Sequence, residues 1–100
     1  MQSKKEIFEE LNRNRAALAR FGISRYGLFG SFVREEQNEE SDIDILVDFK
    51  PDEKTFDNFM NLAFYLEGLL GREVDLVTRE SLSPHIGPKI LTEVEYGIID

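Results

Sequence analysis

Two short motifs in the first half of the chain carry residues suited to phosphate and metal chemistry. Gly30-Ser31 follows an apolar run, and Asp42 and Asp44 flank an isoleucine in a β-branched segment. In a strand, residues i and i+2 point to the same side with Cα atoms roughly 6.6 Å apart, so both carboxylates can reach one hard cation. A glycine turn nearby offers backbone amides to a phosphate. This combination is typical of metal-assisted phosphoryl or nucleotidyl transfer.

A third carboxylate is expected from a neighbouring strand, and Asp75 is the only aspartate centred in one. Three carboxylates around Mg²⁺ leave positions for water and phosphate oxygens. Asp75 could also take the proton from an attacking hydroxyl. Asp48 shares a face with Asp44, but four strand residues separate the two by about 13 Å. We therefore expect Asp48 to be a solvated charge at the end of its strand.

Candidate phosphate contacts follow the glycine turn. Ser31 would offer its amide and hydroxyl at the start of a short helix, and Arg34 could reach back to a triphosphate. Lys50 and Arg79, at strand ends, are weaker candidates. Simpler interpretations also exist: an ordinary serine-capped turn, a solvated arginine, and a polar side of an edge strand. The single histidine, His85, has no cysteine or second histidine to join it in a transition-metal site.

The composition limits the classes of partner. One hundred residues predict a single domain over 1–100, and twenty acidic against twelve basic residues give a net charge of −8. Such a surface repels polyanions, so extended nucleic-acid binding is not expected, whereas a basic protein partner is. The chain has no cysteine, no apolar leader and no run long enough to span a membrane. A soluble cytoplasmic protein without membrane attachment is therefore predicted.

Periodicity and capping residues predict the order of the elements. They are a helix from Ser3 to Gly22, a strand over 25–29, a helical turn from Ser31, a strand over 42–49, a helix from Thr55 to Gly71, a strand over 73–78 and a helix over 88–96. This order predicts an α/β (α+β) fold, with helices packed on a small mixed sheet of three or four strands. Phe56 is expected on the core stripe of its helix, and the apolar tail 96–99 is expected to be exposed and to contact a partner.

The motifs together resemble one known family. The run from Gly30-Ser31 through Arg34 to Asp42-Ile43-Asp44, with Asp75 in its own strand, looks like the minimal nucleotidyltransferase (MNT) family. That family belongs to the DNA polymerase β-like nucleotidyltransferase superfamily, and the similarity covers nearly the whole chain. It implies a minimal polymerase-β-like fold. Many members carry glycine directly after the arginine, whereas this chain has Glu35, which leaves the path of the following loop open.

The resemblance also implies roles and partners. Asp42 and Asp44 would hold two Mg²⁺ ions, with Asp75 as the third carboxylate and base, while Ser31 and Arg34 would contact the phosphates of the nucleotide. Family members commonly serve as the antitoxin of HEPN–MNT toxin–antitoxin pairs, where AMP passes from ATP to a tyrosine of the RNase toxin. Two alternatives keep the fold without the chemistry. One is a partner subunit that only occludes its target, and the other is a catalytically silent nucleotide-binding subunit.

Overall fold

The computed structural model describes residues 2–99, apart from the side chain of Ile98. Its elements, in chain order, are α1 (Lys4–Arg13), α2 (Arg15–Ala19), β1 (Ile23–Phe29), α3 (Ser31–Arg34), β2 (Ile43–Phe49), α4 (Phe56–Leu70), β3 (Val74–Thr78), the 3₁₀ turn η1 (Arg79–Ser81), α5 (Gly87–Glu93) and β4 (Glu95–Ile98). None of the helices described combines the length and apolar character needed to cross a membrane.

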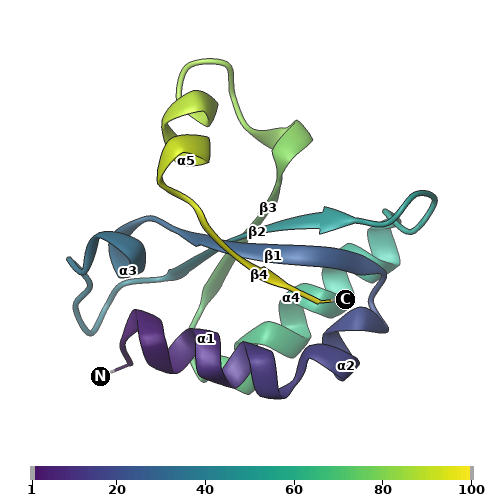
Figure 1. Ribbon diagram of the computed structural model, residues 1–100, viewed down its shortest axis with the longest axis horizontal. Coiled ribbons are helices and arrows are strands. Elements are labelled where there is room, and N and C mark those ends of the chain that lie inside the picture. The colour runs from purple at the N-terminus through teal and green to yellow at the C-terminus, as the bar shows by residue number, and fades with distance from the viewer. Residues whose placement is uncertain (1, 100) are drawn as a thin grey trace.

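The four strands form one mixed sheet in the order β3-β2-β1-β4. The β1 strand pairs antiparallel with β2 and β4, whereas β2 and β3 run parallel. In Figure 1, α1, α2 and α4 lie on one side of the sheet and α5 rises from the other. The predicted α/β class and the mixed sheet are therefore confirmed, with four strands.

The apolar core fills the space between the sheet and α1, α2 and α4. Its largest fully buried side chains from the strands include Leu28, Ile43 and Ile45, and α1, α2 and α4 contribute mainly leucines. The caps follow the sequence: Ser3 and Glu6 form the predicted capping box of α1. Thr55 caps α4, which ends at Gly71 in a left-handed conformation.

Two helix predictions are corrected by the structure. The single helix predicted from Ser3 to Gly22 is two helices, α1 and α2, with a break at Asn14. The side chain of Asn14 donates to the Glu10 carbonyl at 2.8 Å. On α4 the buried residues are leucines at 62, 66 and 70, and Phe56 is 78% exposed. Phe56 sits at the first turn of the helix, and a periodic stripe does not reveal where the sheet beneath a helix ends.

The end of the chain also differs from the prediction. The last helix stops at Glu93, the backbone becomes extended at Val94, and Glu95–Ile98 form an edge strand beside β1. Pairing with β1 supplies hydrogen-bond partners that the open edge of that strand would otherwise lack. Ile99 is 6% exposed and belongs to the core, so the expectation of an exposed tail is wrong for Ile99. The side chain of Ile98 lies outside the described part of the structure.

Candidate active site

Asp44 and Asp75 lie side by side because β2 and β3 run parallel in register. The two aspartates are direct partners in the ladder, and Asp42 immediately precedes β2. Neighbouring strands lie about 4.8 Å apart, so carboxylates on the same side of partner positions can approach one cation. Ile43 and Ile45 are fully buried against the helices, which places Asp44 on the opposite face of the sheet.

Asp44 is the most perturbed carboxyl group of the site. Burial, followed by the neighbouring charges of Asp75 and Asp42, raises its pKa to about 6. Arg34 acts in the opposite direction, and Glu93 adds a smaller unfavourable interaction. A bound cation would offset the unfavourable effect of burial and of the two neighbouring carboxylates on the charge of Asp44.

Gly30 lets the end of β1 approach Asp44 closely. Its φ of +78° lies in the left-handed region, and a Cβ atom built on it would overlap Oδ2 of Asp44. Any side chain at this position would both strain the backbone and displace the carboxylate. The shape of the turn therefore requires glycine for two independent reasons.

Ser31 and Arg34 are the first and last residues of α3, a single helical turn anchored by the fully buried Phe32. The structure thus brings Gly30, Ser31 and Arg34 to the same end of the sheet as Asp44. Glu35, which follows, adopts the left-handed conformation with φ +60° that a glycine favours. The chain therefore keeps the turn at this position without the glycine, at some cost in backbone strain.

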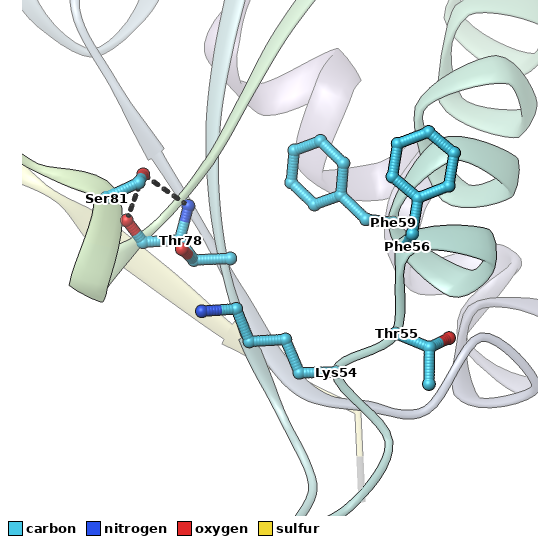
Figure 2. Close-up of a pocket in the computed structure, with 6 residues that line it drawn as sticks. All are labelled: Lys54, Thr55, Phe56, Phe59, Thr78 and Ser81. Atoms are coloured by element: carbon cyan, nitrogen blue, oxygen red, sulfur yellow. Dashed lines mark hydrogen bonds between the residues drawn. The ribbon is translucent and has the colours of Figure 1, made fainter.

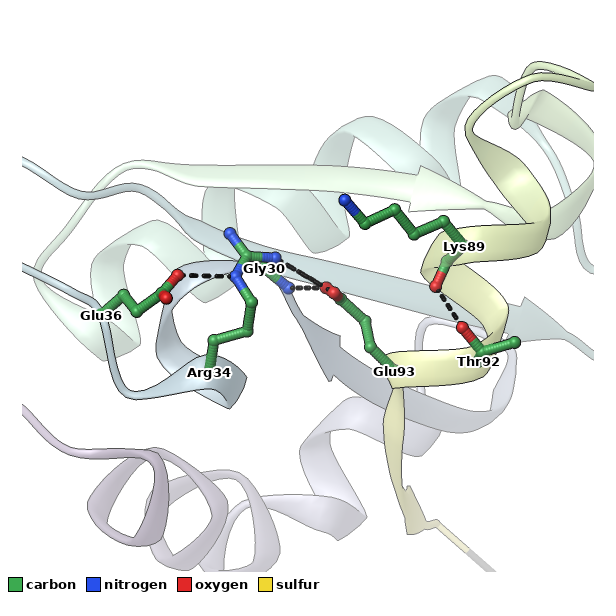
Figure 3. A network of polar contacts seen from close by, with 6 residues as sticks. All are labelled: Gly30, Arg34, Glu36, Lys89, Thr92 and Glu93. Atoms are coloured by element: carbon green, nitrogen blue, oxygen red, sulfur yellow. Dashed lines mark hydrogen bonds and ion pairs between the residues drawn. The ribbon is translucent and has the colours of Figure 1, made fainter.

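The loop that delivers Asp42 is held by a residue that the sequence analysis missed. The Arg72 guanidinium donates to the carbonyls of Asn38, Glu39 and Ser41 at 3.3, 3.0 and 2.9 Å. Arg72 follows α4 and is distant from this loop in sequence, so only the fold brings them together. A second missed residue is Glu93, whose carboxylate accepts from the Gly30 amide and from Arg34 (Figure 3).

Two other charged residues singled out in the sequence, Asp48 and Arg79, belong to a different cluster. Asp48 pairs with Arg25 at 2.5 Å and with Arg79 at 3.4 Å, so the expectation of a solvated charge is wrong. Arg79 also donates to the Tyr96 hydroxyl at 2.9 Å. Consequently Arg79 is engaged away from the Asp44–Asp75 pair.

The donor set suits a hard divalent cation. Aspartate oxygens are the ligands that Mg²⁺ prefers, and burial together with the neighbouring carboxylates raises the pKa of Asp44. Within residues 2–99 no three acidic, histidine or cysteine side chains are already grouped closely enough to hold an ion. Holding one would require the carboxylates of Asp42, Asp44 and Asp75 to converge, and the side chains of Asp42 and Asp75 are exposed.

Two cavities lie on opposite sides of the sheet. One of about 160 Å³ lies between α5 and the Gly30 turn, beside Arg34 and Glu93. Another of about 300 Å³ is lined by Lys54, Thr55, Phe56, Phe59, Thr78 and Ser81 (Figure 2). Thr78 is buried toward the helices, so this second cavity is separated from Asp75 by the sheet. The first cavity therefore lies on the side of the sheet that carries Asp44, and its lining includes Gly30 and Arg34 but none of the three aspartates.

Comparison with known proteins agrees with this geometry. The sequence matches the family model of the nucleotidyltransferase domain over residues 4–99. The protein adenylyltransferase MntA of Thermococcus cleftensis is 49% identical over 77 residues, which cover 77% of each chain. A solved minimal nucleotidyltransferase superposes with a TM-score of 0.71 at 38% identity, covering 88% of this chain and 93% of that one.

A solved toxin–antitoxin complex with AMP-PNP contains a chain that superposes with a TM-score of 0.67 at 31% identity. The match covers 86% of this chain and 72% of that one. The resemblance read from the glycine-serine and aspartate motifs is thereby confirmed. This chain belongs to the nucleotidyltransferase domain family and has the fold of the minimal nucleotidyltransferases.

Proposed function

We propose that this protein is a Mg²⁺-dependent antitoxin that transfers AMP from ATP to a tyrosine hydroxyl of an HEPN-type RNase toxin. The observation that carries the proposal is the register of Asp44 with Asp75, next to a glycine turn that leaves no room for a side chain. The 49% identity to a protein adenylyltransferase supports AMP as the transferred group. The similarity to one chain of a toxin–antitoxin complex supports the kind of partner.

In this proposal Asp42, Asp44 and Asp75 hold two Mg²⁺ ions. Bound Mg²⁺ supplies positive charge to the phosphates of the nucleotide and orients them. Ser31 and the Gly30 amide bind phosphate oxygens, and Arg34 contacts the triphosphate through its guanidinium group. These residues lie at one end of the sheet, so a triphosphate bound there spans from the carboxylates to α3.

The transfer step follows from the same residues. The acceptor oxygen forms a bond to the α-phosphorus while the bond from that phosphorus to pyrophosphate breaks. The proton of the acceptor hydroxyl passes to Asp75, which is exposed and therefore accessible to a side chain of another protein. Asp44 is half-buried and less accessible to a bulky acceptor, which favours Asp75 for the proton.

A basic partner surface is part of the proposal. The net charge of −8 favours association with a positively charged protein and disfavours extended nucleic acid. Electrostatic steering acts on the association rate, so that rate should fall as salt is raised. Association rates that do not change between low and high salt would remove this part of the proposal.

The test is incubation of the protein with Mg-ATP and its HEPN-type partner, followed by intact-mass measurement of the partner. The expected result is a mass increase by whole AMP units that depends on both Mg²⁺ and this chain. An Asp75→Asn variant should reduce the rate of transfer more than the affinity for nucleotide, because the amide keeps the shape but cannot accept the proton. Neutralisation of the partner without any mass change would instead support simple occlusion.

A further inference from the structure

Glu93 occupies the donors that the proposed function assigns to phosphate. Its carboxylate accepts from the Gly30 amide at 2.9 Å, and both of its oxygens lie 3.0 Å from one terminal nitrogen of Arg34. Figure 3 shows this carboxylate reaching from the end of α5 to the turn before α3. Glu93 is mostly buried, with 18% of its side chain exposed, so the contact is part of the packed structure.

Carboxylate and phosphate oxygens are chemically interchangeable at such donors. Both are anionic acceptors that form charge-assisted hydrogen bonds with guanidinium and backbone N–H groups. The Gly30 amide carries a single hydrogen, and it is directed at Glu93. The Nε group of Arg34 is likewise taken by Glu36 at 2.8 Å. A triphosphate that used these donors would have to displace a carboxylate from them.

The surroundings of Glu93 suit an exchange of anions. Lys89 lies one helical turn earlier on α5 and lines the same cavity of about 160 Å³ as Gly30 and Arg34. Within residues 2–99 Lys89 forms no ion pair, so the cavity has two cationic side chains and one internal anion. The α5 helix is short, and Gly87 is its only buried residue, so few of its side chains are fixed in the core.

We propose that Glu93 is an internal competitor that covers the phosphate-binding donors of Gly30 and Arg34 until a nucleotide triphosphate replaces it. The inference rests on the proposed function for its assignment of these donors, but it concerns binding and not transfer. It makes Glu93 a residue that sets nucleotide affinity from a position 63 residues away from the glycine turn.

The experiment is an NMR titration of the full chain with magnesium tripolyphosphate, followed at the Gly30 amide. Glu93→Gln keeps the size of the side chain and an oxygen acceptor while removing the charge. We expect it to bind tripolyphosphate about three- to tenfold more tightly than the wild type. The uncharged side chain binds Gly30 and Arg34 more weakly, so a larger fraction of the molecules has these donors available. Glu93→Ala provides a second variant, with unfolding temperature measured to confirm that both fold.

Glu36→Gln is the matched control, because Glu36 pairs with the same arginine but does not touch the Gly30 amide. It should change the affinity by less than about twofold, since exposed ion pairs contribute little. Equal or weaker binding by folded Glu93→Gln would overturn the inference, as would an equal gain from Glu36→Gln or no shift of the Gly30 amide in any form. Tripolyphosphate carries no AMP, so these outcomes are independent of whether transfer occurs.

Discussion

The two faces of the sheet use the same strands for opposite purposes. On β2, Ile43 and Ile45 are fully buried against the helices, whereas Asp44 between them faces carboxylates on the other side. Burial of apolar side chains on the face covered by the helices stabilises the fold. The opposite face disfavours the charge of Asp44, whose pKa rises to about 6. Residues that stabilise the fold and the residue proposed for chemistry are therefore separated by one step along a strand.

The difference teaches how a domain of 100 residues can tolerate an unfavourable site. A strand fixes the orientation of alternate residues, so the packed face holds the carboxylates in place without contacting them. This arrangement predicts that substitutions on one face change activity and that substitutions on the other change stability. Four measurements test that separation, from the largest expected effect to the smallest.

Asp44→Asn should lower the rate of transfer by about a thousandfold, or about 4 kcal/mol, because the amide removes a metal ligand and its charge. The fold should be retained, as judged by circular dichroism and thermal unfolding. The control is Asp48→Asn, on the same face of the same strand but paired with Arg25. Transfer at the wild-type rate by Asp44→Asn, or an equal loss in Asp48→Asn, would contradict the assignment.

Ile45→Ala should have the reverse effect. Truncation of a fully buried isoleucine leaves a cavity and is expected to lower the free energy of unfolding by about 3 kcal/mol. Urea unfolding measures this loss, and the rate of transfer per folded molecule should remain within about twofold of the wild type. A folded Ile45→Ala protein that had lost transfer would show that the two faces are coupled.

Gly30→Ala and Gly71→Ala separate backbone strain from site geometry. Both glycines have positive φ, but a Cβ meets Asp44 at Gly30 and open space at Gly71. Gly71→Ala should cost about 1 kcal/mol of stability from conformation alone and keep nucleotide binding. Gly30→Ala should cost about 1 kcal/mol more and lose nucleotide binding, as measured by thermal unfolding and titration. Equal behaviour of the two variants would remove the special role of the turn.

The pH dependence of stability is the smallest effect. Because the folded protein holds the Asp44 proton up to about pH 6 and the unfolded chain releases it near pH 4, the Mg²⁺-free protein should lose stability as pH rises between these values. The loss should be on the order of 1–2 kcal/mol, since Asp44 is partly exposed. The contribution of Asp44 is the difference in the free energy of unfolding between the wild type and Asp44→Asn, measured as a function of pH. A difference that does not change across this range would contradict the raised pKa.

Local sequence patterns were enough to predict the arrangement of Asp42 and Asp44 and most of the helices that cover the sheet. Alternation along 42–49 predicted that Asp42 and Asp44 lie on one side of a strand, because the side-chain period of a strand is two whatever surrounds it. Capping residues likewise gave both ends of α4, since Ser, Thr and Gly act through nearby backbone groups. The assignment of Asp75 to a neighbouring strand also held, although its exact partner required the register.

Tertiary structure decided what depends on distant pairing. The edge strand β4 was not predicted: its first two residues were assigned to the last helix and the rest to an exposed tail. Its stability comes from hydrogen bonds to β1, which local propensity does not contain. Phe56 was misplaced because helix periodicity defines a stripe but not the extent of the surface beneath it. Arg72 on the Asp42 loop and Glu93 on the Gly30 amide were missed for the same reason. A lone charged residue has no sequence pattern, and only the folded chain brings it to its partner.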